Sequence, residues 1–120
     1  MTVRWSEDEF ALYMQHLGIH RPQAPPVSEK AFQAAVIRLA KQHGWMAYHT
    51  WSSKRSPEGF PDLVLARAGS PLYGVELKSN TGQVTLAQQA WLDALAGCTG
   101  VVSATWRPKD LEHIVAQLRR

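Results

Sequence analysis

Two acidic residues and a lysine lie beside short apolar runs of the kind that form buried strands. Asp62 ends the string Gly-Phe-Pro-Asp at 59–62 and directly precedes Leu-Val-Leu at 63–65. Glu76 and Lys78 end a second apolar run. Residues i and i+2 of a strand point to the same side, about 7 Å apart, so Glu76 and Lys78 share a face. If the two strands form a hairpin, Asp62 and Glu76 converge on one spot.

This grouping has the chemistry of a divalent-metal site. Two neighbouring carboxylates repel each other unless a cation lies between them. Oxygen ligands that leave room for water and for a substrate phosphate suit Mg²⁺ or Mn²⁺. Lys78, beside such a metal, could orient or help deprotonate an attacking water. The same residues also allow a structural interpretation, in which Asp62 caps a turn and Glu76 and Lys78 form an exposed charge pattern.

The strings at 59–62 and at 76–78 (Glu-Leu-Lys) resemble those of the PD-(D/E)XK nucleases, and among them the VRR-NUC (virus-type replication-repair nuclease) domains. The resemblance covers roughly residues 28–118, with order and spacing intact. Further matching residues are Glu29, Gln33, Gln88, Trp91-Leu92 and Trp106-Arg107-Pro108.

The resemblance implies a metal-dependent nuclease with the active site at these strings. Asp62 and Glu76 would bind one or two Mg²⁺ or Mn²⁺ ions, with the backbone carbonyl of Leu77 as an extra ligand. Lys78 would position the attacking water, and Glu29 would also hold the metal, through water. The products would carry a 5′-phosphate and a 3′-hydroxyl.

Two of the matching residues have alternative roles. The sequence Thr-Leu-Ala-Gln at 85–88 has capping-box spacing, so Gln88 either caps a helix or aligns a phosphate or a water in the active site. Glu29, in the first turn of a predicted helix, favours the helix dipole whether or not it holds a metal.

Four basic residues are candidates for contacts with a DNA backbone. Lys54 and Arg55 lie in a polar segment, 52–59, that we expect to form an exposed loop next to the metal site. Arg107 and Lys109, near the start of the last helix, are further candidates. The net charge of +3 is too mild to establish a polyanionic partner by itself.

The elements that must position these residues follow in the order helix, three strands, helix, strand, helix. Predicted helices span 28–44, 85–97 and 108–118, and predicted strands span 45–50, 63–65, 72–77 and 101–106. Within the second of these helices we expect Leu86, Ala90, Leu92 and Leu95 to face the interior. The order predicts an α/β fold with a restriction-endonuclease-like αβββαβ core, a mixed sheet flanked by helices, and an extra N-terminal helix.

That extra helix belongs to a segment that we expect to be separate from the nuclease domain. Ser6 and Glu9 have capping-box spacing, and a Pro-rich connector follows at 21–26. The apolar stripe of the helix must pack on its own domain or on a second copy; it comprises Phe10, Tyr13, Met14 and Leu17. We therefore divide the chain into a helical arm at 1–27 and a VRR-NUC domain at 28–120.

Several classes of protein are excluded or disfavoured. The single cysteine, Cys98, cannot form an internal disulfide and argues against the usual zinc sites. The chain has neither an apolar run of membrane-spanning length nor a secretory signal at its start, so we expect a cytoplasmic protein of a bacterium or a phage-infected host. No Walker loop, dinucleotide fingerprint or nucleophile elbow is present, and we expect no nucleotide cofactor.

The resemblance also bears on substrate and assembly. Stand-alone VRR-NUC domains resemble Holliday-junction resolvases and act as homodimers, so we expect a homodimeric, structure-selective DNA endonuclease that cuts four-way junctions in repair and recombination. One alternative is a flap or single-strand-directed repair nuclease. A second, from a different class, is a DNA-binding module without catalysis. Asp62, Glu76 and Lys78 argue against this module, since a pure binder has no use for clustered acids facing an anionic ligand.

Overall fold

The computed structural model describes residues 9, 12, 27–51 and 57–120 of the 120-residue chain. The elements follow the predicted order: α2 (Glu29–Gln42), β1 (Met46–His49), β2 (Leu63–Ala66), β3 (Leu72–Leu77), α3 (Leu86–Ala96), β4 (Val101–Trp106), the 3₁₀ turn η1 (Pro108–Asp110) and α4 (Leu111–Arg119). The predicted last helix thus opens as a 3₁₀ turn, closed by the Asp110 N–H donating to the Arg107 carbonyl at 2.8 Å. Within the described ranges, no helix is long and apolar enough to cross a bilayer.

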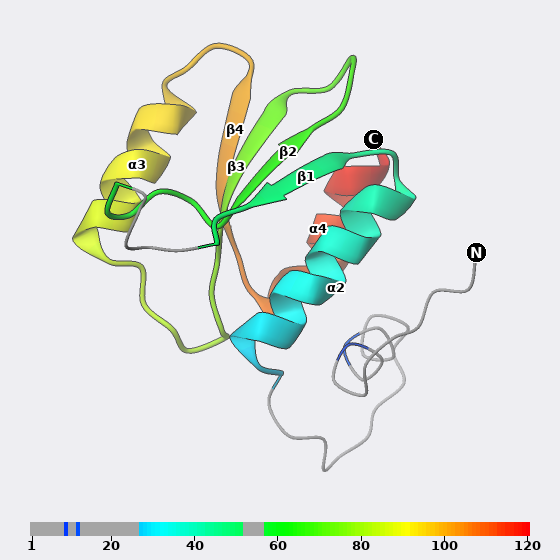
Figure 1. Ribbon diagram of the computed structural model, residues 1–120, viewed down its shortest axis with the longest axis horizontal. Coiled ribbons are helices and arrows are strands. Elements are labelled where there is room, and N and C mark those ends of the chain that lie inside the picture. Colours follow the sequence, from blue (N-terminus) through cyan, green and yellow to red (C-terminus); the bar gives the residue numbers. More distant parts are fainter. Residues whose placement is uncertain (1–8, 10–11, 13–26, 52–56) are drawn as a thin grey trace.

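The four strands form one mixed sheet in the order β1-β2-β3-β4. The first two pairs are antiparallel, whereas β3 and β4 are parallel and are joined through α3. Helices α2 and α4 lie on one side of the sheet and α3 lies on the other (Figure 1). This layered arrangement confirms the predicted restriction-endonuclease-like αβββαβ core.

The main hydrophobic core lies between the sheet and the pair α2 and α4. Alternate residues of β2 and β3 point into it and are almost fully buried: Leu63, Leu65, Val75 and Leu77. Phe32 and Val36 of α2 and Ile114 and Leu118 of α4 pack against them. Because side chains alternate along a strand, Asp62 and Glu76 point to the opposite face, which α3 partly covers.

Helix α3 packs closely on β3 and β4. A Cβ built on Gly74 would lie 2.9 Å from the Leu95 side chain, and the Ser103 hydroxyl donates to the Leu92 carbonyl at 2.8 Å. Leu86 is 92% exposed and Ala90 is exposed too, so the prediction that they face the interior was wrong. At about 100° per residue, both positions lie well away from the stripe that carries Leu92 and Leu95.

The described part of the predicted N-terminal arm packs on its own domain. Leu12 is 1% exposed and belongs to the main core, and the Glu9 carboxylate lies 3.3 Å from Nε of Arg38 on α2. The stripe residues Phe10, Tyr13, Met14 and Leu17 lie outside the described residues.

Gly59 allows the Gly-Phe-Pro-Asp string to press against the start of α3. Its φ is +87°, and an added Cβ would lie 2.4 Å from the carbonyl carbon of Ala87 and 2.7 Å from the backbone nitrogen of Gln88. The Phe60 ring packs edge-on against Trp91 with 5.1 Å between ring centroids. The string that carries Asp62 is therefore held directly against the helix that carries Gln88.

We expect Gly59→Ala to lower the free energy of unfolding by at least about 3 kcal/mol, because both the left-handed backbone and the contact with α3 oppose a side chain. The matched control is Gly69→Ala: Gly69 has a φ of +81° but nothing within 4 Å of an added Cβ. It should lose only about 1–2 kcal/mol. Urea denaturation measures both variants, and equal losses would show that α3 does not confine Gly59.

Candidate active site

Asp62 and Glu76 lie opposite each other on β2 and β3. The strand register pairs Leu63 with Val75, so the next pair outward is Asp62 with Glu76. Oδ2 of Asp62 accepts a hydrogen bond from the Leu77 N–H at 2.8 Å. The hairpin thus brings together the two carboxyl groups that the sequence singled out.

Glu76 is a carboxyl group held in an unfavourable environment. The residue is only 2% exposed. Its Oε1 accepts a hydrogen bond from Nε2 of Gln88 at 3.2 Å, whereas its buried Oε2 has no donor among the described residues. Burying a carboxylate with an unmatched oxygen strongly disfavours the charged form.

The pKa of Glu76 is accordingly raised from 4.5 to about 8. Burial is the largest cause, followed by the hydrogen bond that the protonated Glu76 carboxyl can donate to Asp62, and by the negative charge of Asp62. The positive charge of Lys78 opposes the rise in pKa, and the negative charge of Glu29 adds to it. The three other charged residues predicted for the site, Asp62, Lys78 and Glu29, therefore all act on Glu76.

This donor set fits a hydrated divalent cation. A cation next to the pair would supply the positive charge that the buried Oε2 of Glu76 lacks. In the part of the chain that the structure describes, no three His, Cys, Asp or Glu side chains are grouped closely enough to hold a metal ion by themselves. Two carboxylates with water and substrate completing the shell is the usual environment of Mg²⁺. A ligand role for the Leu77 carbonyl stays a prediction.

Glu29 lies at the edge of this group. It is the first residue of α2, is exposed, and follows the cap residue Ser28, whose hydroxyl accepts from the Ala31 N–H at 3.1 Å. The negative charge of Glu29 contributes to the raised pKa of Glu76. Its role as a metal ligand stays a prediction.

Gln88 performs both parts of a capping box and also contacts the carboxyl pair. Its N–H donates to the Thr85 hydroxyl at 3.1 Å, and its Oε1 accepts from the Thr85 N–H at 2.9 Å. These bonds leave Nε2 directed at Glu76. The helix cap therefore orients the amide toward the site, so the structural role does not exclude a role in the site.

The four predicted DNA contacts divide into two groups. Lys54 and Arg55 lie outside the described residues. Lys109 has an exposed side chain, and its backbone N–H donates to Oδ1 of Asn80 at 2.9 Å. Arg107 is half-buried and its guanidinium donates hydrogen bonds to two backbone carbonyls of the segment after Lys78.

Thr50 also supports the site, although no local sequence pattern indicates it. Its N–H donates to the Asp62 carbonyl and its hydroxyl donates to the Pro61 carbonyl, both at 2.9 Å. The contact extends the β1–β2 register by one residue beyond His49 and Leu63. Thr50 thus fixes the backbone on either side of Asp62.

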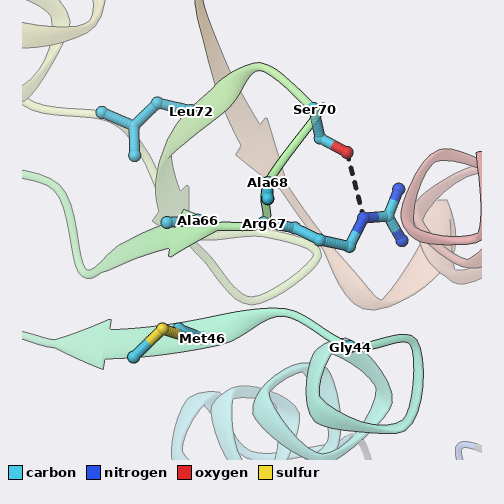
Figure 2. A pocket seen from close by; sticks show the side chains of 7 residues that line it. All are labelled: Gly44, Met46, Ala66, Arg67, Ala68, Ser70 and Leu72. Carbon is cyan, nitrogen blue, oxygen red and sulfur yellow. Dashed lines mark hydrogen bonds between the residues drawn. The ribbon is translucent and has the colours of Figure 1, made fainter.

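A shallow hollow of about 390 Å³ lies at the other end of the strands. Its lining includes Met46, Ala66 and Leu72, and Nε of Arg67 donates to the Ser70 hydroxyl at 3.0 Å beside it (Figure 2). None of the predicted site residues lines it. The candidate active site is therefore the carboxyl pair and not this hollow.

The stability of the metal-free protein should fall as the pH rises. The pKa of Glu76 is higher in the folded protein than its ordinary 4.5, so folding takes up a proton. The stabilisation is complete below about pH 4.5 and is lost as the pH rises through about 8. We expect the melting temperature of the parent to drop between about pH 5 and 8.5 and that of Glu76→Gln to change less.

Glu112→Gln, at an exposed position of α4, is the matched control and should titrate like the parent. At about pH 8.5, Mn²⁺ should raise the melting temperature of the parent more than that of Glu76→Gln. Parallel pH profiles for the parent and Glu76→Gln would contradict the buried-carboxyl interpretation.

Comparisons with known proteins concern the family and the fold of this chain. The sequence model of the VRR-NUC domain family matches residues 5–106, a range that begins inside the predicted arm. A solved structure described as a VRR_NUC domain protein superposes with a TM-score of 0.61 at 19% identity, covering 78% of this chain and 89% of that one. Hjc, a Holliday junction resolvase from the archaeal hyperthermophile Archaeoglobus fulgidus, gives a TM-score of 0.47 at 20% identity, covering 65% and 67%. No curated protein matches.

At these identities the structural likeness concerns the fold alone. The family match spans most of the sequence, and the chain therefore belongs to the VRR-NUC nuclease family.

Proposed function

We propose that this chain is a divalent-metal-dependent endodeoxyribonuclease whose active site is formed by Asp62, Glu76 and Lys78. Membership of a nuclease family implies phosphodiester hydrolysis. The observation that carries the proposal is the buried Glu76 carboxyl, which lies opposite Asp62, has one oxygen without a donor in the described part of the chain, and has a pKa of about 8. A cation bound at this pair would offset the negative charge of the two carboxylates and favour the approach of an anionic substrate.

Each residue of the site has its own role in this proposal. Asp62 and Glu76, with the Leu77 carbonyl, would hold Mg²⁺ or Mn²⁺, and Glu29 would contribute through water. The cation, when bound, would lower the pKa of water and offset charge on the scissile phosphate. The Lys78 ammonium donates hydrogen bonds that orient the attacking water in line with the phosphorus. Gln88 holds the Glu76 carboxyl in place.

The DNA backbone would be held by basic side chains near this site. Lys54 and Arg55 precede the Gly-Phe-Pro-Asp string, and Lys109 is exposed next to the segment that follows Lys78. Contacts of this kind bind phosphates without regard to base sequence.

We expect Asp62→Ala, Glu76→Ala and Lys78→Ala each to reduce cleavage at least about 100-fold while retaining most of the affinity for DNA. The carboxylate variants lose metal and not phosphate contacts, and removing a negative charge favours an anionic ligand. Ca²⁺ should support binding with little cutting. Asp93→Ala, an exposed acid on α3, is the matched control. Cleavage in excess chelator would contradict the metal mechanism.

We further propose that two copies assemble around a two-fold axis and cut four-way junctions symmetrically. Resolution requires cuts in two strands of like polarity, and the described residues of one chain provide one carboxyl pair, so two copies match the substrate. The part of the sheet that α3 leaves open offers apolar surface for the interface: Met46 is 78% exposed, Tyr48 57% and Leu72 41%. The outer edge of β1 is also unpaired within the described sheet.

Light scattering should give twice the 13.4-kDa mass of the chain, and Met46→Glu should shift the protein toward the monomer because the interface would bury a charge. Cleavage of a four-way junction is then compared with that of its constituent duplex and of a flap in Mg²⁺ and in Mn²⁺. A monomer that cuts flaps and leaves junctions whole would overturn the resolvase assignment and leave the nuclease assignment intact.

A further inference from the structure

The segment that follows Lys78 is tied to the end of β4 by one side chain. Nη1 of Arg107 donates to the Ser79 carbonyl at 2.7 Å and to the Gly82 carbonyl at 2.6 Å. The Lys78 N–H donates to the Trp106 carbonyl at 3.1 Å. Residues 78–82 are therefore held next to the end of β4, which runs parallel to β3.

The turn at 79–82 forms one wall of the Lys78 side chain. The Gly82 N–H donates to the Ser79 hydroxyl at 2.9 Å, which closes the turn. A Cβ built on Gly82 would lie 3.5 Å from Cδ of Lys78, so the Gly82 backbone flanks the lysine stem. Lysine has among the largest rotamer entropies of the side chains, and a fixed wall restricts where its ammonium can lie.

Arg107 is itself firmly placed. Its backbone N–H donates to Oδ2 of Asp110 at 3.0 Å, and its carbonyl accepts from the Asp110 N–H at 2.8 Å. A second tie runs from the Lys109 N–H to Oδ1 of Asn80 at 2.9 Å. The guanidinium therefore connects the end of β4 to the 79–82 turn. Its Nη1 already donates to two carbonyls of the chain.

We propose that Arg107 is a positioning residue that fixes the 79–82 turn, and through it the Lys78 side chain beside Asp62 and Glu76. This role replaces the DNA contact predicted for Arg107 from the sequence, and it rests on the proposed nuclease function. Both carbonyls bind Nη1, whose two hydrogens lie in the plane of the guanidinium at the end of a side chain one atom longer than that of lysine, so a lysine ammonium does not reproduce this reach and geometry. The role therefore depends on the shape of Arg107 and not only on its charge.

The test compares Arg107→Lys and Arg107→Ala with the parent. Because a small misplacement of a catalytic group is costly, kcat should fall about 10- to 100-fold in both variants. KM, and the affinity for DNA in Ca²⁺, should stay within about twofold of the parent, with an unchanged salt dependence. Millimolar methylguanidinium should restore part of the kcat of Arg107→Ala.

Two further variants separate positioning from DNA contact. Lys109→Ala, whose tie to Asn80 is made by the backbone, should instead weaken binding and make the salt dependence shallower. Gly82→Ala keeps Arg107 but places a methyl group 3.0 Å from the Ser79 hydroxyl that closes the turn, and 3.5 Å from Cδ of Lys78. It should therefore disturb the turn and lower kcat without changing the affinity. Lys41→Ala, an exposed cation in the last turn of α2, is the charge-matched control.

The outcomes are distinguishable. A parent that cuts no DNA with any divalent metal overturns the proposed function before any variant is compared. If the parent is active, an Arg107→Lys protein with parental kcat, or an Arg107→Ala protein that loses affinity as Lys109→Ala does, overturns the positioning role. Melting curves show whether each variant is folded. If Arg107→Ala does not fold, Arg107→Lys decides the question, and a parental kcat in that variant overturns the positioning role.

Discussion

The burial of Glu76 directly opposite Asp62 is the constraint on which the rest of the site depends. A carboxyl group that is 2% exposed, faces a second acid and has one oxygen with no donor among the described residues is destabilising for the fold that contains it. The surrounding groups reduce this cost: the Leu77 N–H binds Asp62, the Gln88 amide binds Glu76, and the charge of Lys78 acts against the raised pKa. A buried acid in these surroundings costs stability, so we explain its presence by the metal site proposed above.

The mixed sheet determines how these groups meet. The antiparallel pair β2–β3 places Asp62 opposite Glu76. The parallel pair β3–β4 needs a crossover, and that crossover is α3, whose first turn lays Gln88 against Glu76. Because β4 runs parallel to β3, the residues after both strands lie at the same end of the sheet, and Arg107 reaches the turn after Lys78. The antiparallel pair and the parallel pair thus each bring a different group to the same end of the sheet.

Local features of the fold could be predicted from the sequence, whereas several contacts between distant segments could not. Ser28 and the capping box of Thr85 and Gln88 are local signals, and the structure confirms the helices that they predict. The pairing of Asp62 with Glu76 was predictable because a short turn joins their strands. The contacts of Thr50 and Arg107 were not, since they depend on strand register and on a partner strand brought in through a helix. Leu86 was misassigned because its position on the helix surface depends on where the sheet lies, and not on its apolar character.

The raised pKa of Glu76 makes metal binding at the proposed site depend on pH. Near neutral pH the metal-free Glu76 holds a proton for most of the time, because its pKa is about 8. A cation that uses this oxygen must therefore displace a proton, and its apparent affinity increases with pH until the carboxyl group is ionised. Lys78 moderates this competition, since its positive charge favours the ionised carboxylate and also repels the arriving cation. In the proposed mechanism, the position of the Lys78 ammonium would therefore affect both metal binding and the orientation of water, and the turn beside its stem would influence both.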